Sequence, residues 1–247
     1  MPRPRMVVVG GPPGSGKTSR FPITEFGLAS FNADNRAAEL NAGSFRGISK
    51  ETRSQVNLEF QQWILNHISE GRSFAIETTL RSDITFEQAQ LAREHGFQTA
   101  MYFVTTGSVE ESIRRIKARA YRGGHSASER VVRQIYEKSM GHLATALDHK
   151  SSGFDTVDIY DNSANFAEQK VVQPVLSYRD GEPTYLTEQV PEWLEEVIMK
   201  AGSHVGYIRE RLDPGRFRAT KLDRKPSPES GPDDKPDPDR DTFDLDR

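Results

Sequence analysis

The sequence predicts an α/β fold, in which a central and mostly parallel sheet is flanked by helices. Short apolar segments of strand length alternate along the chain with segments of helical spacing. Several of the short segments are almost continuously apolar, as expected when helices cover both faces of a parallel sheet. The five predicted core strands are residues 5–10, 29–32, 73–78, 99–105 and 156–160.

Three long helices are predicted between these strands. Ser49 has the side chain of an N-cap, and apolar residues from Val56 to Ile64 follow it at helical spacing. A second helix is predicted from Ser108 through Arg119, and a third begins near Ser128. Such an order of elements is typical of a sheet whose strands are joined by helical crossovers.

The pattern changes after residue 162. Two β-type segments flank Asp180-Gly181, which predicts a hairpin with a tight turn, and Pro191 opens a last amphipathic helix. From about residue 221 the chain holds nine acidic residues and five prolines, which predicts disorder. We therefore expect three regions: a core at 1–165 with a lid at about 119–130, a hairpin and helix packing on the core at 166–205, and a linker with an acidic, proline-rich tail at 206–247.

Composition excludes several classes of site. The chain of 247 residues has no cysteine, which rules out disulfides, thiolate metal sites and a cysteine nucleophile. Its net charge is −3, and without the acidic tail the acids and bases balance, which argues against nucleic acid as a partner. The sequence has no apolar stretch of membrane-spanning or signal-peptide length. We therefore expect a cytoplasmic protein with no membrane partner.

The strongest motif directly follows the first predicted strand. Residues 11–18 match G-x-x-x-x-G-K-[ST] at every fixed position. Backbone N–H groups of such a loop bind phosphates, while Lys17 reaches the β- and γ-phosphates and the Thr18 hydroxyl ligates Mg²⁺. The motif therefore predicts a P-loop NTPase or kinase fold that binds ATP and Mg²⁺, against the alternative of an ordinary Gly/Pro turn. The predicted nucleotide-binding residues of the loop are Gly11, Pro12, Pro13, Gly14, Ser15, Gly16, Lys17 and Thr18.

Two carboxylates lie at or just beyond the carboxyl ends of the second and third predicted strands. Ligands of open α/β sheets bind beyond the carboxyl ends of the strands, where Asp34 could accept the proton of an attacking hydroxyl. The alternative is that Asp34 caps the short helix that follows it, a role that Asn35 could also fill. Glu77 points into the same crevice or faces solvent.

Arginines gather on the helix before the predicted lid. Arg115, Arg119 and Arg122 are spaced to share one helical face. The Gly-Gly pair that follows ends this helix, and the segment up to Ser128 is predicted to be a mobile lid. Lid arginines of small kinases stabilise the transferring phosphoryl group. The alternative is a solvated basic face that neighbouring glutamates neutralise.

Together these motifs resemble the zeta-toxin family over about residues 5 to 180. The motifs are the phosphate loop, Asn32-Ala33-Asp34, Ile76-Glu77-Thr78-Thr79, the run from Arg119 to His125, and Asp161-Asn162-Ser163. The resemblance implies a kinase that uses ATP and Mg²⁺ to phosphorylate a hydroxyl of a small metabolite. It names UDP-N-acetylglucosamine as the first acceptor to consider, and an antitoxin protein that blocks the ATP site as a partner.

The resemblance also implies roles for individual residues. Asp34 is the base and contacts the acceptor together with Thr79, Arg81 and Glu77, although Glu77 could instead orient Mg²⁺-bound water. Arg119 and Arg133 are the catalytic lid arginines, and Arg122 can substitute for either and contacts the nucleotide. Asn162 lies near the adenine.

Some features depart from the family pattern. Pro13 stands where the family usually has Asn, so one backbone N–H donor is missing from the loop. The hairpin and the tail have no assigned counterpart. Two other functions therefore remain open: an ATP-dependent regulatory switch without a metabolite acceptor, and a kinase that acts on nucleic-acid ends.

Overall fold

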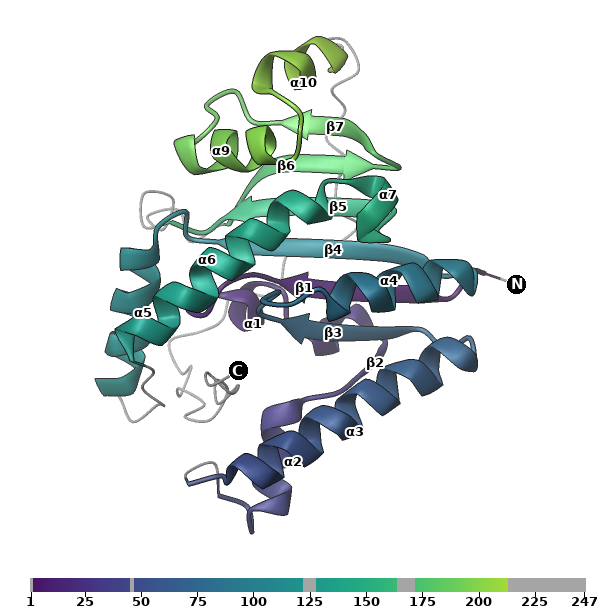
Figure 1. Ribbon diagram of the computed structural model, residues 1–247, viewed down its shortest axis with the longest axis vertical. Helices are drawn as coiled ribbons and strands as arrows, with labels where there is room; N and C mark the ends of the chain where they lie inside the picture. Colours follow the sequence, from purple (N-terminus) through teal and green to yellow (C-terminus); the bar gives the residue numbers. More distant parts are fainter. Residues whose placement is uncertain (1, 45–46, 122–127, 164–171, 213–247) are drawn as a thin grey trace.

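The protein is built around one seven-stranded sheet (Figure 1). The computed structural model describes residues 2–44, 47–121, 128–163 and 172–212. The strand order is β2-β3-β1-β4-β5-β6-β7, which confirms the predicted α/β class. The strands are β1 (Arg5–Gly10), β2 (Ala29–Ser30), β3 (Phe74–Thr78), β4 (Gln98–Thr105), β5 (Thr156–Asp161), β6 (Gln173–Arg179) and β7 (Glu182–Leu186).

The first five strands run parallel, with β1 between β3 and β4. In this register Val9 of β1 lies opposite Glu77 of β3 on one side and Tyr102 of β4 on the other. Because parallel strands end at the same edge of a sheet, the segments that follow β1, β3, β4 and β5 lie beside one another.

Helices connect the strands, and Figure 1 shows α4 and α6 lying across one face of the sheet. None of the helices among the described residues is long and apolar enough to cross a membrane. The helices are α1 (Lys17–Arg20), the 3₁₀ turn η1 (Ile23–Phe26), α2 (Ala33–Leu40), α3 (Lys50–Ser69), α4 (Ile84–Glu94), α5 (Val109–Tyr121), α6 (Glu129–Ala146), α7 (His149–Ser152), α9 (Glu192–Lys200) and α10 (Val205–Arg211).

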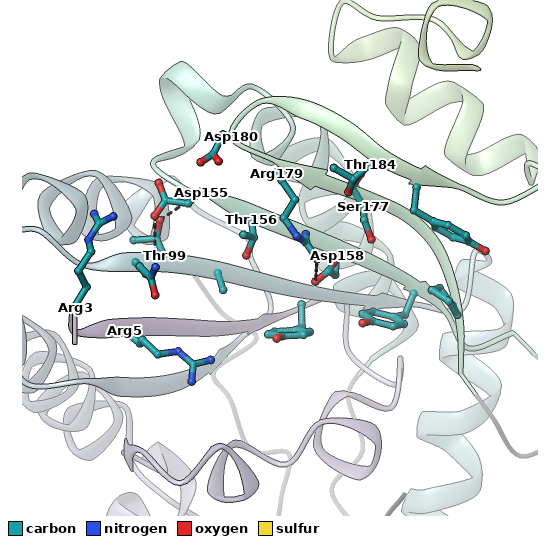
Figure 2. Close-up of a pocket in the computed structure, with 16 residues that line it drawn as sticks. Arg3, Arg5, Thr99, Asp155, Thr156, Asp158, Ser177, Arg179, Asp180 and Thr184 are labelled. Atoms are coloured by element: carbon teal, nitrogen blue, oxygen red, sulfur yellow. Dashed lines mark hydrogen bonds and ion pairs between the residues drawn. The ribbon is translucent and has the colours of Figure 1, made fainter. Parts of the chain in front are cut away.

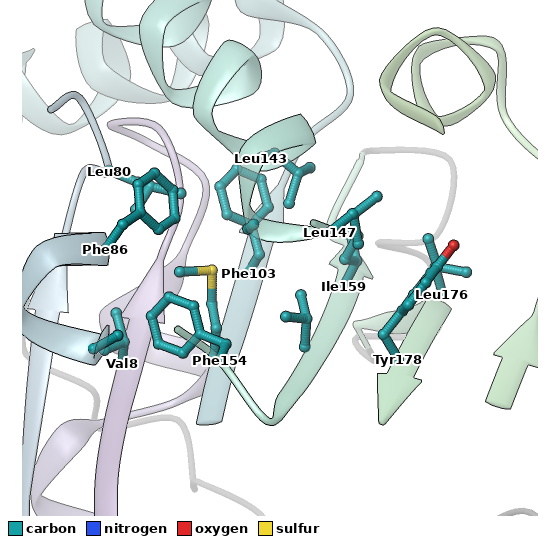
Figure 3. Close-up of a cluster of buried hydrophobic side chains, with 14 of the residues drawn as sticks. Val8, Leu80, Phe86, Phe103, Leu143, Leu147, Phe154, Ile159, Leu176 and Tyr178 are labelled. Carbon is teal, nitrogen blue, oxygen red and sulfur yellow. The ribbon is translucent and has the colours of Figure 1, made fainter. Parts of the chain in front are cut away.

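The main apolar core lies between the sheet and the helices that cover this face (Figure 3). Phe103 of β4 and Ile159 of β5 are fully buried there, beside Leu143 of α6. The same cluster continues through Leu176 of β6 to Leu194 of α9. One core therefore joins the phosphate-loop half of the chain to its C-terminal part.

The predicted core strands are confirmed, with one informative difference. β2 ends at Ser30 instead of residue 32, because Asn32 already caps α2 by accepting a hydrogen bond from the Asn35 backbone N–H at 3.0 Å. Neither Asp34 nor Asn35 is the cap, so the capping role considered for them is wrong. Ser49 caps α3 as predicted, accepting from the Thr52 N–H at 3.1 Å.

The C-terminal part differs from the prediction in two ways. The hairpin β6–β7 is part of the central sheet itself, because β6 pairs antiparallel with β5 and so extends the sheet. The predicted linker from residue 206 begins inside α10, where Ile208 is fully buried against the core cluster. Residues 122–127 of the predicted lid and the predicted tail lie outside the described residues.

Two neighbouring residues of α9 test whether the C-terminal part folds with the core. Ile198 is fully buried and Met199 is 63% exposed. We expect Ile198→Ala to lower the free energy of unfolding by about 3 kcal/mol, because it leaves a cavity in the core. Met199→Ala on the same helix should change it by less than about 0.5 kcal/mol. Urea unfolding measures both, and an Ile198→Ala variant as stable as wild type contradicts the shared core.

Candidate active site

A cleft of about 630 Å³ opens where β1, β2 and β3 end. Its volume is within the range of about 300 to 1,000 Å³ typical of small-ligand sites. Eight of the predicted site residues line it, although they come from four separate segments of the chain. They are Pro13, Lys17, Thr18, Asp34, Glu77, Thr79, Arg81 and Arg119.

The phosphate loop holds its lysine against its own backbone. Lys17 is only 7% exposed, and its Nζ donates to the carbonyls of Gly11 at 2.8 Å and Pro12 at 3.1 Å. Helix α1 has a single turn, since the residue before Pro22 is disfavoured in helical conformation. A helix this short has a small dipole, so phosphate binding here would depend mainly on the loop N–H groups and Lys17.

The Thr18 hydroxyl of α1 and the Glu77 carboxylate of β3 meet in the cleft. Thr18 Oγ1 lies 3.1 Å and 3.0 Å from the two oxygens of Glu77, to which it donates. No group of three or more acidic or histidine side chains among the described residues could hold a metal by itself. Mg²⁺ in kinase sites is usually held by one or two protein oxygens together with phosphates and water. The Thr18–Glu77 pair fits such an ion.

Asp34 lies in the first turn of α2 and is 5% exposed. The Asn32 cap begins the helix at Ala33. Asp34 is the second residue of this helix, and it lines the same cleft as Lys17 and Thr18. The carboxylate and the phosphate loop therefore share one cavity, which is the arrangement that proton transfer to Asp34 requires.

Among the described residues that line the cleft, basic side chains outnumber acidic ones. Four basic side chains and two carboxylates face it. The basic residues are Lys17, Arg53, Arg81 and Arg119, and the acidic ones are Asp34 and Glu77. Such an excess of positive charge favours ligands with several negative charges, such as phosphorylated molecules.

Arg133 does not line this cleft, unlike Arg119. It lies on α6, where its guanidinium contacts the Glu110 carboxylate at 2.8 Å. Donation from Arg133 holds the pKa of the Glu110 carboxyl below its usual value. Arg133 thus forms a surface ion pair with a neighbouring glutamate, as in the alternative of a solvated basic face, and does not face the cleft. Arg122 lies outside the described residues.

Asn162 supports the phosphate loop from behind. Its Nδ2 donates to the carbonyl of Ser15 at 2.8 Å, and its side chain is packed so closely that a Cβ on Gly16 would come within 2.4 Å of it. Gly16 has φ +90°, so both its conformation and this contact require glycine. The predicted contact of Asn162 with adenine stays a prediction.

Helix α3 supplies cleft residues that the sequence analysis missed. Arg53, Asn57 and Gln61 line one wall, and their spacing of four places them on one helical face. Phe31 and Phe60 lie beside them with ring centroids 5.3 Å apart. The polar residue at every fourth position was the available signal in the sequence.

A second concavity of about 560 Å³ lies over β1 and β4 to β7 (Figure 2). Its polar side chains largely satisfy one another: Arg179 pairs with Asp158 at 2.8 Å, and Asp155 accepts from the Thr99 N–H at 2.9 Å. None of the predicted site residues lines it. The cleft at the phosphate loop is therefore the candidate active site.

Comparisons with known proteins show what the chain as a whole is similar to. An uncharacterized protein of Haemophilus influenzae is 31% identical over 101 residues, which is 41% of this chain and 62% of that protein. The fold resembles a chain from the PezAT toxin-antitoxin system of Streptococcus pneumoniae, with a TM-score of 0.51 and 16% identity over 85% of this chain and 88% of that one. It also resembles AvrRxo1-ORF1:-ORF2 with ATP, with a TM-score of 0.57 and 14% identity over 81% of this chain and 64% of that one.

These structural likenesses show a shared fold, and the sequence shows the family. The family described as Zeta toxin matches residues 1–168, which include the phosphate loop, Asp34, Glu77 and Asn162. With more than half of the chain matched and its site residues inside the match, the protein belongs to the Zeta toxin family.

Proposed function

We propose that this protein is an ATP- and Mg²⁺-dependent kinase that transfers the γ-phosphoryl group to a hydroxyl of a small metabolite. One observation carries the proposal: Asp34 is buried in the same cleft as Lys17 and Thr18. A phosphate loop alone serves kinases, switches and motors equally. A carboxylate that faces the loop across a small cavity adds the base that transfer to an alcohol needs.

Each residue then has a chemical role. The loop N–H groups and Lys17 hold the β- and γ-phosphates, and Thr18 with Glu77 would hold Mg²⁺, which neutralises phosphate charge when bound. Asp34 accepts the proton of the acceptor hydroxyl while the oxygen of that hydroxyl forms a bond to the γ-phosphorus. The bond between that phosphorus and the bridging oxygen breaks, and ADP leaves. Arg119 stabilises the negative charge of the phosphoryl group in transfer.

For the acceptor, UDP-N-acetylglucosamine is the first candidate. Membership of the Zeta toxin family supports it, and so does the excess of basic over acidic side chains in the cleft, because a diphosphate group carries negative charge. In this proposal Thr79 and Arg81 bind the acceptor beside Asp34. The acceptor hydroxyl must then lie within hydrogen-bond reach of the Asp34 carboxylate.

We also infer a protein partner that restrains the kinase. The similar Streptococcus pneumoniae structure comes from a toxin-antitoxin system. A partner that covers the cleft would compete with ATP. Co-purification from the native source, followed by nucleotide titration of the complex and of the separated kinase, identifies the partner and measures the competition.

The base assignment predicts a loss of transfer without a loss of nucleotide binding. We expect Asp34→Asn to lower the rate of phosphoryl transfer by at least about 100-fold, because general-base catalysis contributes about 10² to 10⁴. Lys17→Ala should weaken nucleotide binding itself. The assay follows label from [γ-³²P]ATP into a metabolite extract and into purified UDP-N-acetylglucosamine.

Glu39→Gln provides the matched control, since it removes another carboxylate of α2 at a residue that does not line the cleft. Equal transfer rates in wild type and Asp34→Asn contradict the base assignment. ATP hydrolysis without any labelled metabolite instead favours the regulatory switch, and label on oligonucleotide ends favours a nucleic-acid kinase.

The Thr18–Glu77 contact predicts which of the two roles Glu77 has. We expect Glu77→Gln to raise the Mg²⁺ concentration for half-maximal activity about tenfold, as loss of a group that orients metal ligands typically does. Thr79→Val, at a neighbouring cleft position, should raise the KM for the acceptor and leave the Mg²⁺ concentration for half-maximal activity unchanged. If Glu77→Gln changes only the acceptor KM, Glu77 binds the acceptor instead.

A further inference from the structure

We propose that Trp193 is a positioning residue of the nucleotide site, acting through Asp161 and Asn162 on the phosphate loop. Trp193 lies on α9, beyond the residues that the family match covers. The inference rests on the proposed nucleotide binding, but not on the identity of the acceptor. It gives helix α9 a function that its sequence does not indicate.

The first step is the contact between Asn162 and the loop. The Asn162 side chain is 6% exposed and donates to the carbonyl of Ser15 at 2.8 Å. It also lies directly against Gly16, the residue before the phosphate-binding lysine. A displacement of Asn162 would therefore remove the hydrogen bond and the packing that hold this half of the loop in place.

The second step is the turn that presents Asn162. Its backbone N–H donates to the Thr105 carbonyl at 2.7 Å, and its carbonyl accepts from Arg115 at 2.6 Å. The preceding Asp161 is almost fully buried and accepts two hydrogen bonds, from the Ser163 N–H at 2.7 Å and from Trp193 Nε1 at 3.1 Å. A buried carboxylate depends on such donors, so each fixes where Asp161 can lie.

The third step is the fixed position of the indole. Its ring packs on the backbone of Gly107, in the turn that follows β4, where a Cβ would come within 2.5 Å of Nε1. Helix α9 itself is anchored in the core by Leu194, Val197 and Ile198. Trp193 thus contacts both the turn after β4 and the last residue of β5 from a helix anchored in the core.

Trp193→Phe separates this role from plain packing, because phenylalanine keeps an aromatic ring but has no N–H. Asp161 then loses one of its two donors, and the turn that carries Asn162 becomes less constrained. We expect the Kd for fluorescent mant-ADP to rise about fivefold, which corresponds to the net contribution of one ordinary hydrogen bond. With any acceptor that is turned over, the KM for ATP should rise similarly while kcat stays within about twofold.

Val197→Ala is the matched control on the same helix. It removes buried packing without touching Asp161, so it should lower the melting temperature more than Trp193→Phe and leave the mant-ADP Kd unchanged. A wild-type Kd in Trp193→Phe overturns the proposal, and so does an equal rise in Val197→Ala. Lys17→Ala is measured in parallel, and an unchanged Kd there shows instead that the nucleotide site itself is misassigned.

A spectroscopic measurement follows the same link in the wild-type protein. The chain has two tryptophans, Trp63 and Trp193. Incorporation of 5-fluorotryptophan gives one ¹⁹F resonance for each, and Trp193→Phe assigns them by deleting one. We expect the Trp193 resonance to shift when ADP saturates the protein. A Trp193 resonance that stays in place at saturating ADP contradicts the link.

Discussion

The parallel pairing of β1 with β3 on one side and β4 on the other is the constraint on which the site depends. It sets Val9 opposite Glu77, so the loop after β1 begins beside the carboxylate at the end of β3. Thr18, nine residues beyond Val9, then reaches Glu77 at about hydrogen-bond distance. The pairing of β4 with β5 places Asn162 on the other side of the same loop.

Hydrogen bonds within the protein hold the charged groups of the site in place. Burying the Lys17 ammonium is tolerated because two loop carbonyls accept from it, and those bonds can be exchanged for phosphate oxygens. Asp34 is fixed by a helix that the Asn32 side chain begins. Donors and acceptors held in this way need little rearrangement during phosphoryl transfer, which is how electrostatic stabilisation becomes effective.

Local patterns predicted what depends on neighbours in sequence, namely the strands, the phosphate loop and the Ser49 cap. Helix α4 was missed because polar Thr85 and Gln88 are among its buried residues, which breaks the apolar period. Asn32, Asp34 and Asn35 are all able to cap a helix, and only the path of the chain after β2 decides among them. The Arg133–Glu110 and Trp193–Asp161 pairs join residues 23 and 32 positions apart, so tertiary packing alone reveals them.

The central claim is that one cleft grips the triphosphate with Lys17 and places Thr18 and Glu77 at its metal ion. The most direct measurement is a crystal structure of the protein with Mg²⁺ and a non-hydrolysable ATP analogue. We predict that Lys17 Nζ contacts the terminal phosphates in place of the Gly11 and Pro12 carbonyls, with Thr18 Oγ1 bound to the metal. A nucleotide bound elsewhere, with Lys17 still on its own loop carbonyls, would contradict it.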